Sequence, residues 1–346
     1  RSPIFPIYLV NSRGRNFLSL DTLFSDTVQR GKSSHLCART ASSWPAPILE
    51  ESVKTSATAD THGFNFSRTP GTPEASELYL ELLKQVLTRA DFPDRFRNIE
   101  ALMGPRRKAV LSAIQRVLRP LGLSLIGLPD EASHPKYGPT QCTYGETMMG
   151  LPRLNQLHDA VRTVVLENIP GDMIETGVWR GGAAILMRAA LRAYGDVSRT
   201  VWLADSFQGV PPPDEENYPA DAGSVFWKLD YLSVSLEEVK RNFERFGLLD
   251  DRVSFLPGWF KDTLPTAPIK QLSILRVDGD SYESTIDALV HLYPKVSPRG
   301  FVIIDDYGAV EACKAAVEDF RRMHGITEPM TMVHDWQESC VYWRRS

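Results

Sequence analysis

The chain has 346 residues, enough for one large domain with additional segments or for two domains. Hydrophobic residues make up 42% and charged residues 24%, an ordinary balance for a globular protein, and the net charge of −4 disfavours a nucleic-acid partner. No run of about 18 apolar residues occurs, so neither a transmembrane helix nor a membrane partner is expected. The four cysteines form no CxxC pair, which argues against a zinc site and a dense disulfide framework and fits a reducing compartment.

Residues 1–73 differ in composition from the rest of the chain. They are rich in Ser, Thr, Pro and Gly and show no helical or strand period, and their first part has more basic than acidic residues. Such an Arg- and Ser-rich, acid-poor composition is typical of organellar transit segments. We expect a disordered or targeting-like extension, and a cytoplasmic protein, or an organellar one if the extension is a transit peptide.

Residues 74–153 are expected to form a helical N-terminal region and lid. Leucines and a valine in 77–87 lie on one face of a helix, and a second amphipathic pattern covers 105–118. The basic flank 106–108 is interpreted as a solvated helix face rather than a surface for lipid or an acidic partner. A loop punctuated by glycine and proline follows at 128–152.

Residues 154–346 have the regular alternation of an α/β domain, beginning with a helix at 154–167. Strands are expected at 173–175, 200–205, 253–256, 272–278 and 301–305, and helices at 182–194, 236–246, 282–292 and 310–324. This alternation predicts a parallel sheet covered by helices on both faces. The final strands, 330–334 and 340–343, have no helix between them, so they predict a hairpin whose last strand is antiparallel, at or near an edge.

The turn after the first of these strands has the chemistry of a ligand site. It begins at Glu175 and continues as Gly177-x-x-x-Gly181-Gly182, which is not the G-x-G-x-x-G spacing of a dinucleotide site. Its glycines still let a ligand approach the backbone, and a helix N-terminus offers N–H groups to a carboxylate. The alternative is that these glycines only permit close packing of strand and helix.

Two acids narrow the choice of ligand. Glu175 suits a ligand ammonium group, and Asp205, at the end of the next strand, suits the two hydroxyls of a ribose. An amine, a carboxylate and a ribose together describe S-adenosylmethionine better than a dinucleotide, which would need space for a pyrophosphate.

Three further acids indicate a metal site. Asp278 ends the fourth strand, and Asp305 and Asp306 end the fifth. Neighbouring parallel strands lie about 5 Å apart, so these carboxylates should converge beside the cofactor. They would repel each other without a cation, and oxygen-only ligands favour Mg²⁺ first and Ca²⁺ or Mn²⁺ next. The alternative is that Asp306 and Asp280 merely cap the helices that follow them.

A cation at this position has a use in methyl transfer. It lowers the pKa of a bound substrate hydroxyl and fixes its direction towards a sulfonium methyl group. Asp278 is the candidate for accepting the proton of that hydroxyl.

Five motifs in order along the chain resemble one known family. They occupy residues 175–182, 204–211, 256–265, 275–285 and 303–307. They are similar to those of the macrocin O-methyltransferase family, which includes deoxysugar O-methyltransferases of macrolide and aminocoumarin biosynthesis. The similarity extends over about residues 76–346, and it is weak in 92–140.

The resemblance implies a class I methyltransferase fold, which is Rossmann-like with a seven-stranded sheet, together with S-adenosyl-L-methionine, Mg²⁺ and a homodimer. It implies that Asp278, Asp305 and Asp306 hold the metal and that Asp278 is the catalytic base. Thr147 and Met148 would then close over the methionine end of the cofactor. The cofactor contacts as a whole would be Thr147, Met148, Glu175, Gly177, Gly181, Asp205, Ser206, Gly258 and Trp259.

The function expected from these observations is methylation of a hydroxyl group on a sugar or glycosylated natural product. The alternatives are a metal-dependent catechol or phenol O-methyltransferase, a nucleotide-sugar- or NAD-binding oxidoreductase, and a catalytically inactive binding module. The loops 137–150 and 210–218 are expected to form a lid over the acceptor, because loops at this end of a sheet carry specificity.

Overall fold

The computed structural model describes residues 72–88, 145–335 and 339–346, together with Ile114, Arg116 and Val117 and the backbone of four short strands. The chain divides into two compact units, residues 1–68 with 96–128 and residues 69–95 with 129–346. In the first unit the described strands form a small antiparallel sheet in the order β2-β1-β4-β3. Its strands are β1 (Ile7–Asn11), β2 (Leu18–Ser19), β3 (Arg97–Asn98) and β4 (Leu123–Gly127).

Several predicted segments lie largely outside the described residues. They are the extension 1–73, the helix 105–118 and the loop 128–144. In the part of the chain that is described, no helix is both long and apolar enough to cross a membrane.

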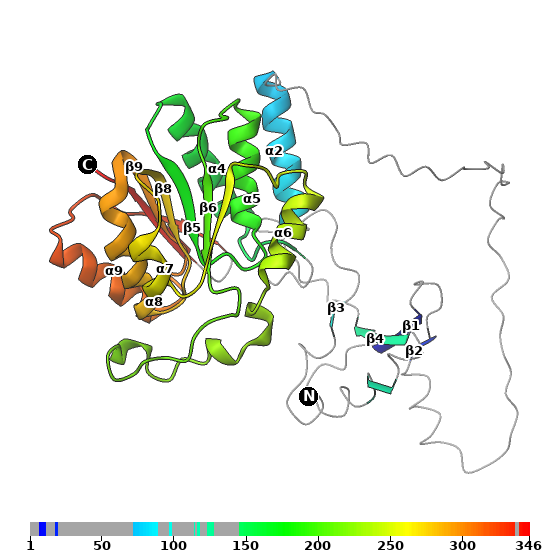
Figure 1. The fold of residues 1–346 in the computed structure, drawn as a ribbon. Helices are drawn as coiled ribbons and strands as arrows, with labels where there is room; N and C mark the ends of the chain where they lie inside the picture. Colours follow the sequence, from blue (N-terminus) through cyan, green and yellow to red (C-terminus); the bar gives the residue numbers. More distant parts are fainter. Residues whose placement is uncertain are drawn as a thin grey trace, which may run out of the picture. The chain divides into compact units, whose positions relative to one another are not determined.

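The second unit is built on a seven-stranded sheet in the order β10-β11-β9-β8-β5-β6-β7 (Figure 1). Its strands are β5 (Asp172–Thr176), β6 (Val201–Asp205), β7 (Val253–Pro257), β8 (Leu272–Val277), β9 (Val296–Ile304), β10 (Thr331–His334) and β11 (Ser339–Arg344). Strands β5 to β9 pair in parallel, and β11 lies antiparallel between β9 and β10. The predicted parallel sheet with an antiparallel last strand near one edge is confirmed.

The order of the strands places a crevice between β5 and β8. From β5 the chain adds β6 and β7 on one side and then returns to add β8 and β9 on the other. The crossovers therefore diverge at the β5–β8 pair, and ligands of open α/β sheets bind outside the carboxyl ends of the strands at such a point.

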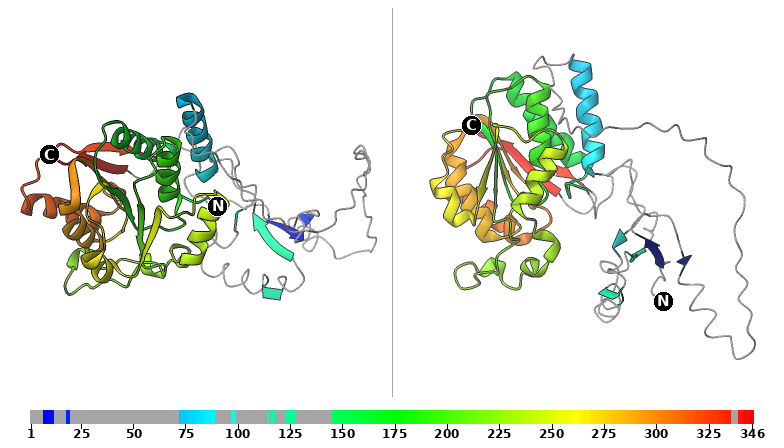
Figure 2. Two further views of the ribbon diagram at one scale, coloured as in Figure 1. Left: turned by 45° about the horizontal axis from the view of Figure 1, so that its top comes forward. Right: turned by 45° about the vertical axis from the view of Figure 1, so that its right-hand side comes forward.

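Helices cover both faces of the sheet, as the two views in Figure 2 show. One face carries α2 (Pro73–Thr88), α4 (Leu151–Leu166), α5 (Gly182–Ala193) and α6 (Leu236–Arg245), and the other carries α7 (Phe260–Thr263), α8 (Tyr282–Leu292) and α9 (Glu311–Met323). Side chains alternate between the two cores along each strand: Met173 packs into the first and Ile174 into the second. Burial on both faces explains why these strands are almost continuously apolar.

Helix α2 is fastened to the domain by both apolar and polar contacts. Leu80, Leu83 and Leu87 are buried, and the buried Lys84 ammonium lies 2.5 Å from the side-chain oxygen of Asn155 in α4. These contacts confirm the predicted helix at 77–87 and show that it is part of the core of this unit.

Two elements of the α/β domain begin three or more residues before their predicted starts. Helix α4 begins at Leu151 rather than at residue 154, because Pro152 lies in its first turn, where a missing N–H costs nothing. Strand β9 begins at Val296 rather than at residue 301, and so includes Pro298 and Gly300. Its first half is irregular: the register with β8 shifts there, and Arg299 adopts a φ of 66°.

Candidate active site

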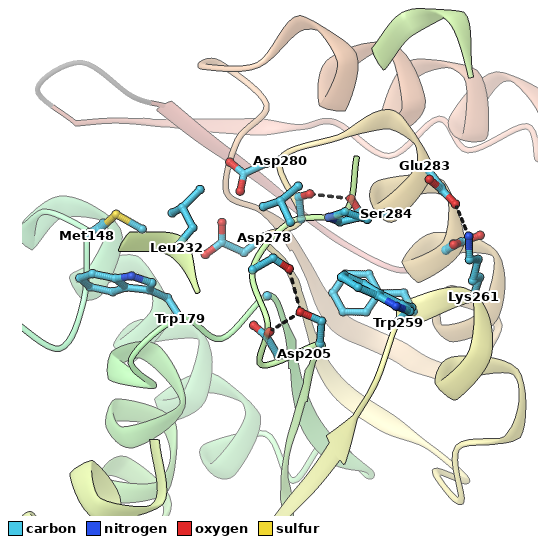
Figure 3. A pocket seen from close by; sticks show the side chains of 18 residues that line it. Met148, Trp179, Asp205, Leu232, Trp259, Lys261, Asp278, Asp280, Glu283 and Ser284 are labelled. Carbon is cyan, nitrogen blue, oxygen red and sulfur yellow. Dashed lines mark hydrogen bonds and ion pairs between the residues drawn. The ribbon is translucent and has the colours of Figure 1, made fainter. Parts of the chain in front are cut away.

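Two adjoining cavities open at the carboxyl ends of the central strands. The wider one is partly open to solvent, has a cavity volume of about 240 Å³ and is lined by Asp205, Ser206 and Trp259 among others. The narrower one is lined by Glu175, Arg276 and further acids. Both share the side chains Met148, Trp179, Leu232, Asp278 and Asp280, so they adjoin and together form one cleft. These five side chains are labelled in Figure 3, which draws the lining of the wider cavity. Its size is that of a site for a cofactor or small substrate.

Gly177 joins the two strands that flank the crevice. Its φ is +88°, and a Cβ atom there would lie 1.5 Å from the carbonyl oxygen of Asp278. The Asp278 N–H donates to the carbonyl of Thr176 at 2.8 Å, which holds the two strand ends together. Close packing of the two strands is therefore enough to explain why residue 177 is a glycine. Gly177 also lines the wider cavity.

Three non-glycine residues beside the cleft adopt a left-handed backbone. Trp179, Phe207 and Asp280 have φ values of 47°, 55° and 60°, and each follows closely the end of one of the strands β5, β6 and β8. Such conformations cost about 1–3 kcal/mol each and cluster at functional sites. Trp179 and Asp280 both line the cleft, so the strain lies where a ligand would bind.

The two acids predicted to contact the cofactor are held by the backbone. One Glu175 oxygen accepts the N–H of Ala184 in α5 at 3.0 Å, and burial raises the pKa of Glu175 to about 8. The Asp205 carboxylate accepts the N–H groups of Val178 and Phe207, each at 2.7 Å. Burial also raises the pKa of Asp205, against these hydrogen bonds. Both carboxylates therefore have fixed orientations.

The other predicted cofactor residues fall into two groups. Thr147 lines the narrower cavity, Met148 lines both, and Ser206 and Trp259 line the wider one. Gly181 and Gly258 line neither of these cavities. Gly181 precedes α5 with a φ of 89°, and the Gly258 N–H donates to the backbone carbonyl of Asp205 at 2.9 Å, so both glycines act through backbone geometry.

The three predicted metal ligands converge. Asp278, Asp305 and Asp306 each offer a carboxylate oxygen, and these oxygens all lie within 4.8 Å of one another. Burial raises the pKa of Asp278 to about 6. Burial, followed by the charges of Asp280, Asp278 and Asp305, raises the pKa of Asp306 well above its usual range.

The helix-cap alternative for Asp280 and Asp306 does not hold in the structure. Helix α8 is capped by Ser281, whose side chain accepts the N–H of Ser284, and the residue before α9 is Val310. The Asp306 carboxylate instead accepts the N–H of Asp280 at 3.2 Å, which joins the loops after β8 and β9.

Two buried arginines are functional candidates that the sequence analysis missed. Arg276 is 1% exposed, and its Nη1 lies 2.6 Å from Glu175 and 2.7 Å from Asp278, while its Nη2 lies 2.7 Å from Asp305. Arg153, also buried, reaches the other oxygen of Asp305 at 2.6 Å. Burial would raise the pKa of Asp305, but the two guanidinium groups outweigh it and hold that pKa below its usual range.

Only one of these arginines left a signal in the sequence. Arg276 is the single charged residue of the buried strand Leu272–Val277, and a lone charge in a buried strand needs a partner. Arg153 lies in the first turn of α4, far in sequence from Asp305, and no local pattern marks it.

The donor set fits a divalent cation. The two arginines face a larger number of acids, and Asp306 makes no ion pair with any residue that the structure describes. A cation would neutralise the remaining negative charge, and three carboxylates are ligands for a hard cation such as Mg²⁺.

A parallel sheet with a cleft at its switch point, an acid after each of the first two strands and glycines in the first turn defines a class I methyltransferase with a Rossmann-like fold. The chain belongs to the macrocin-O-methyltransferase (TylF) family, whose sequence model matches residues 76–345. It is therefore an O-methyltransferase, as the five motifs predicted.

Three relatives illustrate the similarity. An enzyme of Streptomyces olivaceus named 8-demethyl-8-(2,3-dimethoxy-alpha-L-rhamnosyl)-tetracenomycin-C 4′-O-methyltransferase is 45% identical over 276 residues, 80% of this chain and 95% of that enzyme. Mycinamicin III 3″-O-methyltransferase of Micromonospora griseorubida is 50% identical over 207 residues, 59% of this chain and 80% of the enzyme. The solved structure of the O-methyltransferase NovP superposes with a TM-score of 0.66 at 42% identity, covering 78% of this chain and 99% of NovP.

Proposed function

We propose that this enzyme transfers the methyl group of S-adenosylmethionine to a sugar hydroxyl of a glycosylated natural product, with Mg²⁺ as the divalent cation. The observation that carries the proposal is the convergence of Asp278, Asp305 and Asp306 inside a cleft that also contains Glu175 and Asp205. The sugar acceptor is supported by the relative named for the 4′ oxygen of a rhamnosyl tetracenomycin.

The cleft offers complementary groups along the length of the cofactor. In the wider cavity, the Asp205 carboxylate is placed to accept hydrogen bonds from the ribose hydroxyls. The Trp259 ring offers an apolar surface for the adenine. In the narrower cavity, Glu175 and Thr147 lie beside the N-terminus of α5, where a ligand carboxylate and ammonium group find partners.

The three converging aspartates would hold the cation. When bound, a cation of this kind lowers the pKa of a coordinated hydroxyl and fixes its direction. The protein itself orients the carboxylates: Arg276 fixes Asp278, and Arg153 together with Arg276 fixes Asp305. Such preorganisation keeps the donors in place before the acceptor arrives.

Two carboxylates are candidates for accepting the hydroxyl proton. Asp278 lies in the carboxylate cluster, where it would be next to a coordinated hydroxyl, but Arg276 lies 2.7 Å from it. Asp280 also lines both cavities and faces the same space (Figure 3). Asp280→Asn distinguishes them, because Asp280 is not one of the three proposed cation ligands. Loss of methyl transfer with cation affinity retained would assign the base to Asp280, and retained methyl transfer would assign it to Asp278.

The segment between β6 and α6 is proposed to form the wall of the acceptor site. Val210 and Pro211 line the wider cavity. Farther along, the Asp221 carboxylate accepts the N–H groups of Tyr282 and Glu283 at 2.7 and 3.0 Å, which fastens the segment to α8. We expect limited proteolysis of this segment to slow when S-adenosylhomocysteine is added, and equal cleavage in both states would contradict a lid that closes.

A transfer assay tests the proposed reaction. The enzyme is incubated with S-adenosylmethionine and Mg²⁺ and offered rhamnosylated polyketides, glycosylated macrolides and simple catechols. We expect one methyl group to be added to the sugar of a glycoside. Transfer to a catechol with none to any glycoside would favour the phenol-methylating alternative. The homodimer implied by the family resemblance stays a prediction, which analytical ultracentrifugation tests.

A further inference from the structure

A short segment covers the narrower cavity from the side of α4. We call residues 145–150 the cover segment; it carries Thr147 and Met148, which both line the cleft. Its Glu146 carbonyl accepts the N–H of Gly182 at the start of α5 at 2.9 Å. A Cβ atom at Gly182 would lie 2.4 Å from that carbonyl oxygen, so the cover segment is in close contact with the helix N-terminus.

One guanidinium group connects this cover segment to the carboxylate cluster. Arg153 Nη2 donates to the carbonyl of Met148 at 3.1 Å, and Nη1 lies 2.6 Å from Asp305. Arg153 Nε lies 2.9 Å from the Asp335 carboxylate, which also accepts the N–H of Gly150 at 2.7 Å. The Arg153 side chain is 3% exposed, so these contacts are shielded from solvent.

We propose that Arg153 is a positioning residue that fastens the cover segment to the cation-binding carboxylate Asp305 and so affects the binding of both the cofactor and the cation, in opposite directions. The inference rests on the proposed function, since it assigns the cleft to S-adenosylmethionine and the aspartates to a cation. The fork of the guanidinium makes the mechanical link, because its separate N–H groups reach the carbonyl and the carboxylates at the same time.

The charge of Arg153 and its fork act in opposite directions on the two ligands. The fork holds the cover segment over the cofactor and favours cofactor binding. The positive charge lies beside Asp305 and competes with a cation for that carboxylate. Removing Arg153 should therefore weaken cofactor binding and strengthen cation binding, whereas general loosening of the site would weaken both.

Two substitutions of Arg153 separate the effect of its positive charge from the effect of its forked hydrogen bonds. Arg153→Gln removes both, and we expect S-adenosylhomocysteine to bind about tenfold more weakly and Mn²⁺, used as a probe, about tenfold more tightly. Arg153→Lys keeps the charge at a single point, so cofactor affinity should fall by a similar factor while Mn²⁺ affinity stays within about twofold of wild type.

Arg180→Gln is the matched control. Arg180 Nη1 donates to the carbonyl of Gly145 at 3.0 Å and so holds the other end of the cover segment, without an ion pair to any of the three clustered aspartates. We expect weaker cofactor binding with unchanged Mn²⁺ affinity. Hydrogen exchange of residues 145–150 should accelerate in all three variants.

The experiment is calorimetric titration of each protein with S-adenosylhomocysteine and, separately, with Mn²⁺. Wild-type protein that binds neither ligand would refute the proposed function itself. If wild type binds both, the inference is supported by opposite shifts in Arg153→Gln, and it is overturned if both affinities fall together or neither changes. If the Arg153→Gln variant does not fold, Arg153→Lys tests the inference instead. Unchanged affinity of Arg153→Lys for S-adenosylhomocysteine would show that Arg153 does not hold the cover segment in place.

Discussion

Asp278, at the end of β8, and Asp306, just beyond β9, place carboxylate oxygens within 4.8 Å of each other. The strands are parallel neighbours, so their carboxyl ends meet at one edge of the sheet. Arg276 pairs with Asp278, whereas Asp306 makes no ion pair with the residues that the structure describes. Asp306 is therefore the acid whose charge a cation would satisfy most directly.

Asp306→Asn is the cleanest test of the cation site. It removes a donor charge but leaves both arginines paired, so we expect cation affinity to fall at least about tenfold, with methyl transfer lost and the melting temperature nearly unchanged. Calorimetry with Mg²⁺ and a thermal melt measure these effects. Asp262→Asn, in the exposed turn α7, is the control and should change neither. Undiminished Mg²⁺ binding by the Asp306 variant would contradict the assignment.

Arg276→Met should be strongly destabilising. It leaves the buried carboxylates of Asp278 and Asp305 without this guanidinium group, which costs about 3–5 kcal/mol in the free energy of unfolding. The matched variant is Arg188→Met, because among the described residues Arg188 forms an ion pair only with Asp250, whose side chain is 31% exposed; we expect about 1–2 kcal/mol there. Urea unfolding compares the two. Equal losses of unfolding free energy in the two variants would show that the ion pairs of Arg276 contribute no more to stability than the single ion pair of Arg188.

The raised pKa of Glu175 predicts a pH dependence of stability. Burial raises this pKa from 4.5 to about 8 in the folded protein, so the folded state binds the extra proton between those values. The contribution of Glu175 to stability is full below about pH 4.5 and is lost as the pH rises through 8, at about 1.4 kcal/mol per pH unit.

Comparison with Glu175→Gln isolates this effect. The difference in unfolding free energy, wild type minus variant, should fall steadily between about pH 5 and 8. Asp305, whose pKa is shifted in the opposite direction, is present in both proteins and largely cancels. Urea titrations at several pH values provide the measurement, and a difference that is flat or rises with pH would show that Glu175 is ionised throughout.

Gly177→Ala tests the close approach of β5 and β8. The new Cβ would meet the Asp278 carbonyl oxygen at 1.5 Å and would also sit at a φ of +88°, so we expect a loss of at least about 3 kcal/mol. Gly223 is the control, because its φ is +78° but, apart from its chain neighbours, no heavy atom of the described residues lies within 4 Å of the position that a Cβ would take there. Gly223→Ala should cost about 1 kcal/mol. Similar melting temperatures for the two variants would argue against the strand contact.

The fold was predictable because the apolar strands, the amphipathic helices and their alternation along the chain all indicate the same architecture. Apolar strands such as Leu272–Val277 alternate with amphipathic helices, and that pattern specifies a parallel sheet covered on both faces. The start of β9 was not predictable, because Pro298 and Gly300 are turn residues and only the irregular pairing with β8 accommodates them in a strand.

The acids of the site were predictable and their partners were not. Asp278, Asp305 and Asp306 follow strand ends, and the geometry of a parallel sheet brings strand ends together. Arg153 reaches Asp305 from a helix that precedes the sheet, and this contact depends on how α4 packs against β9 and the last hairpin. Such long-range contacts leave no periodic trace in the sequence.

The most direct test of the central claim is a structure of the enzyme crystallised with S-adenosylhomocysteine and Mn²⁺, with the metal located by its anomalous signal. We expect the cofactor along the cleft, with its ribose at Asp205 and its amino group towards Glu175, and the metal peak between Asp278, Asp305 and Asp306. A metal peak elsewhere, or none at saturating Mn²⁺ with the cofactor in place, would contradict the account.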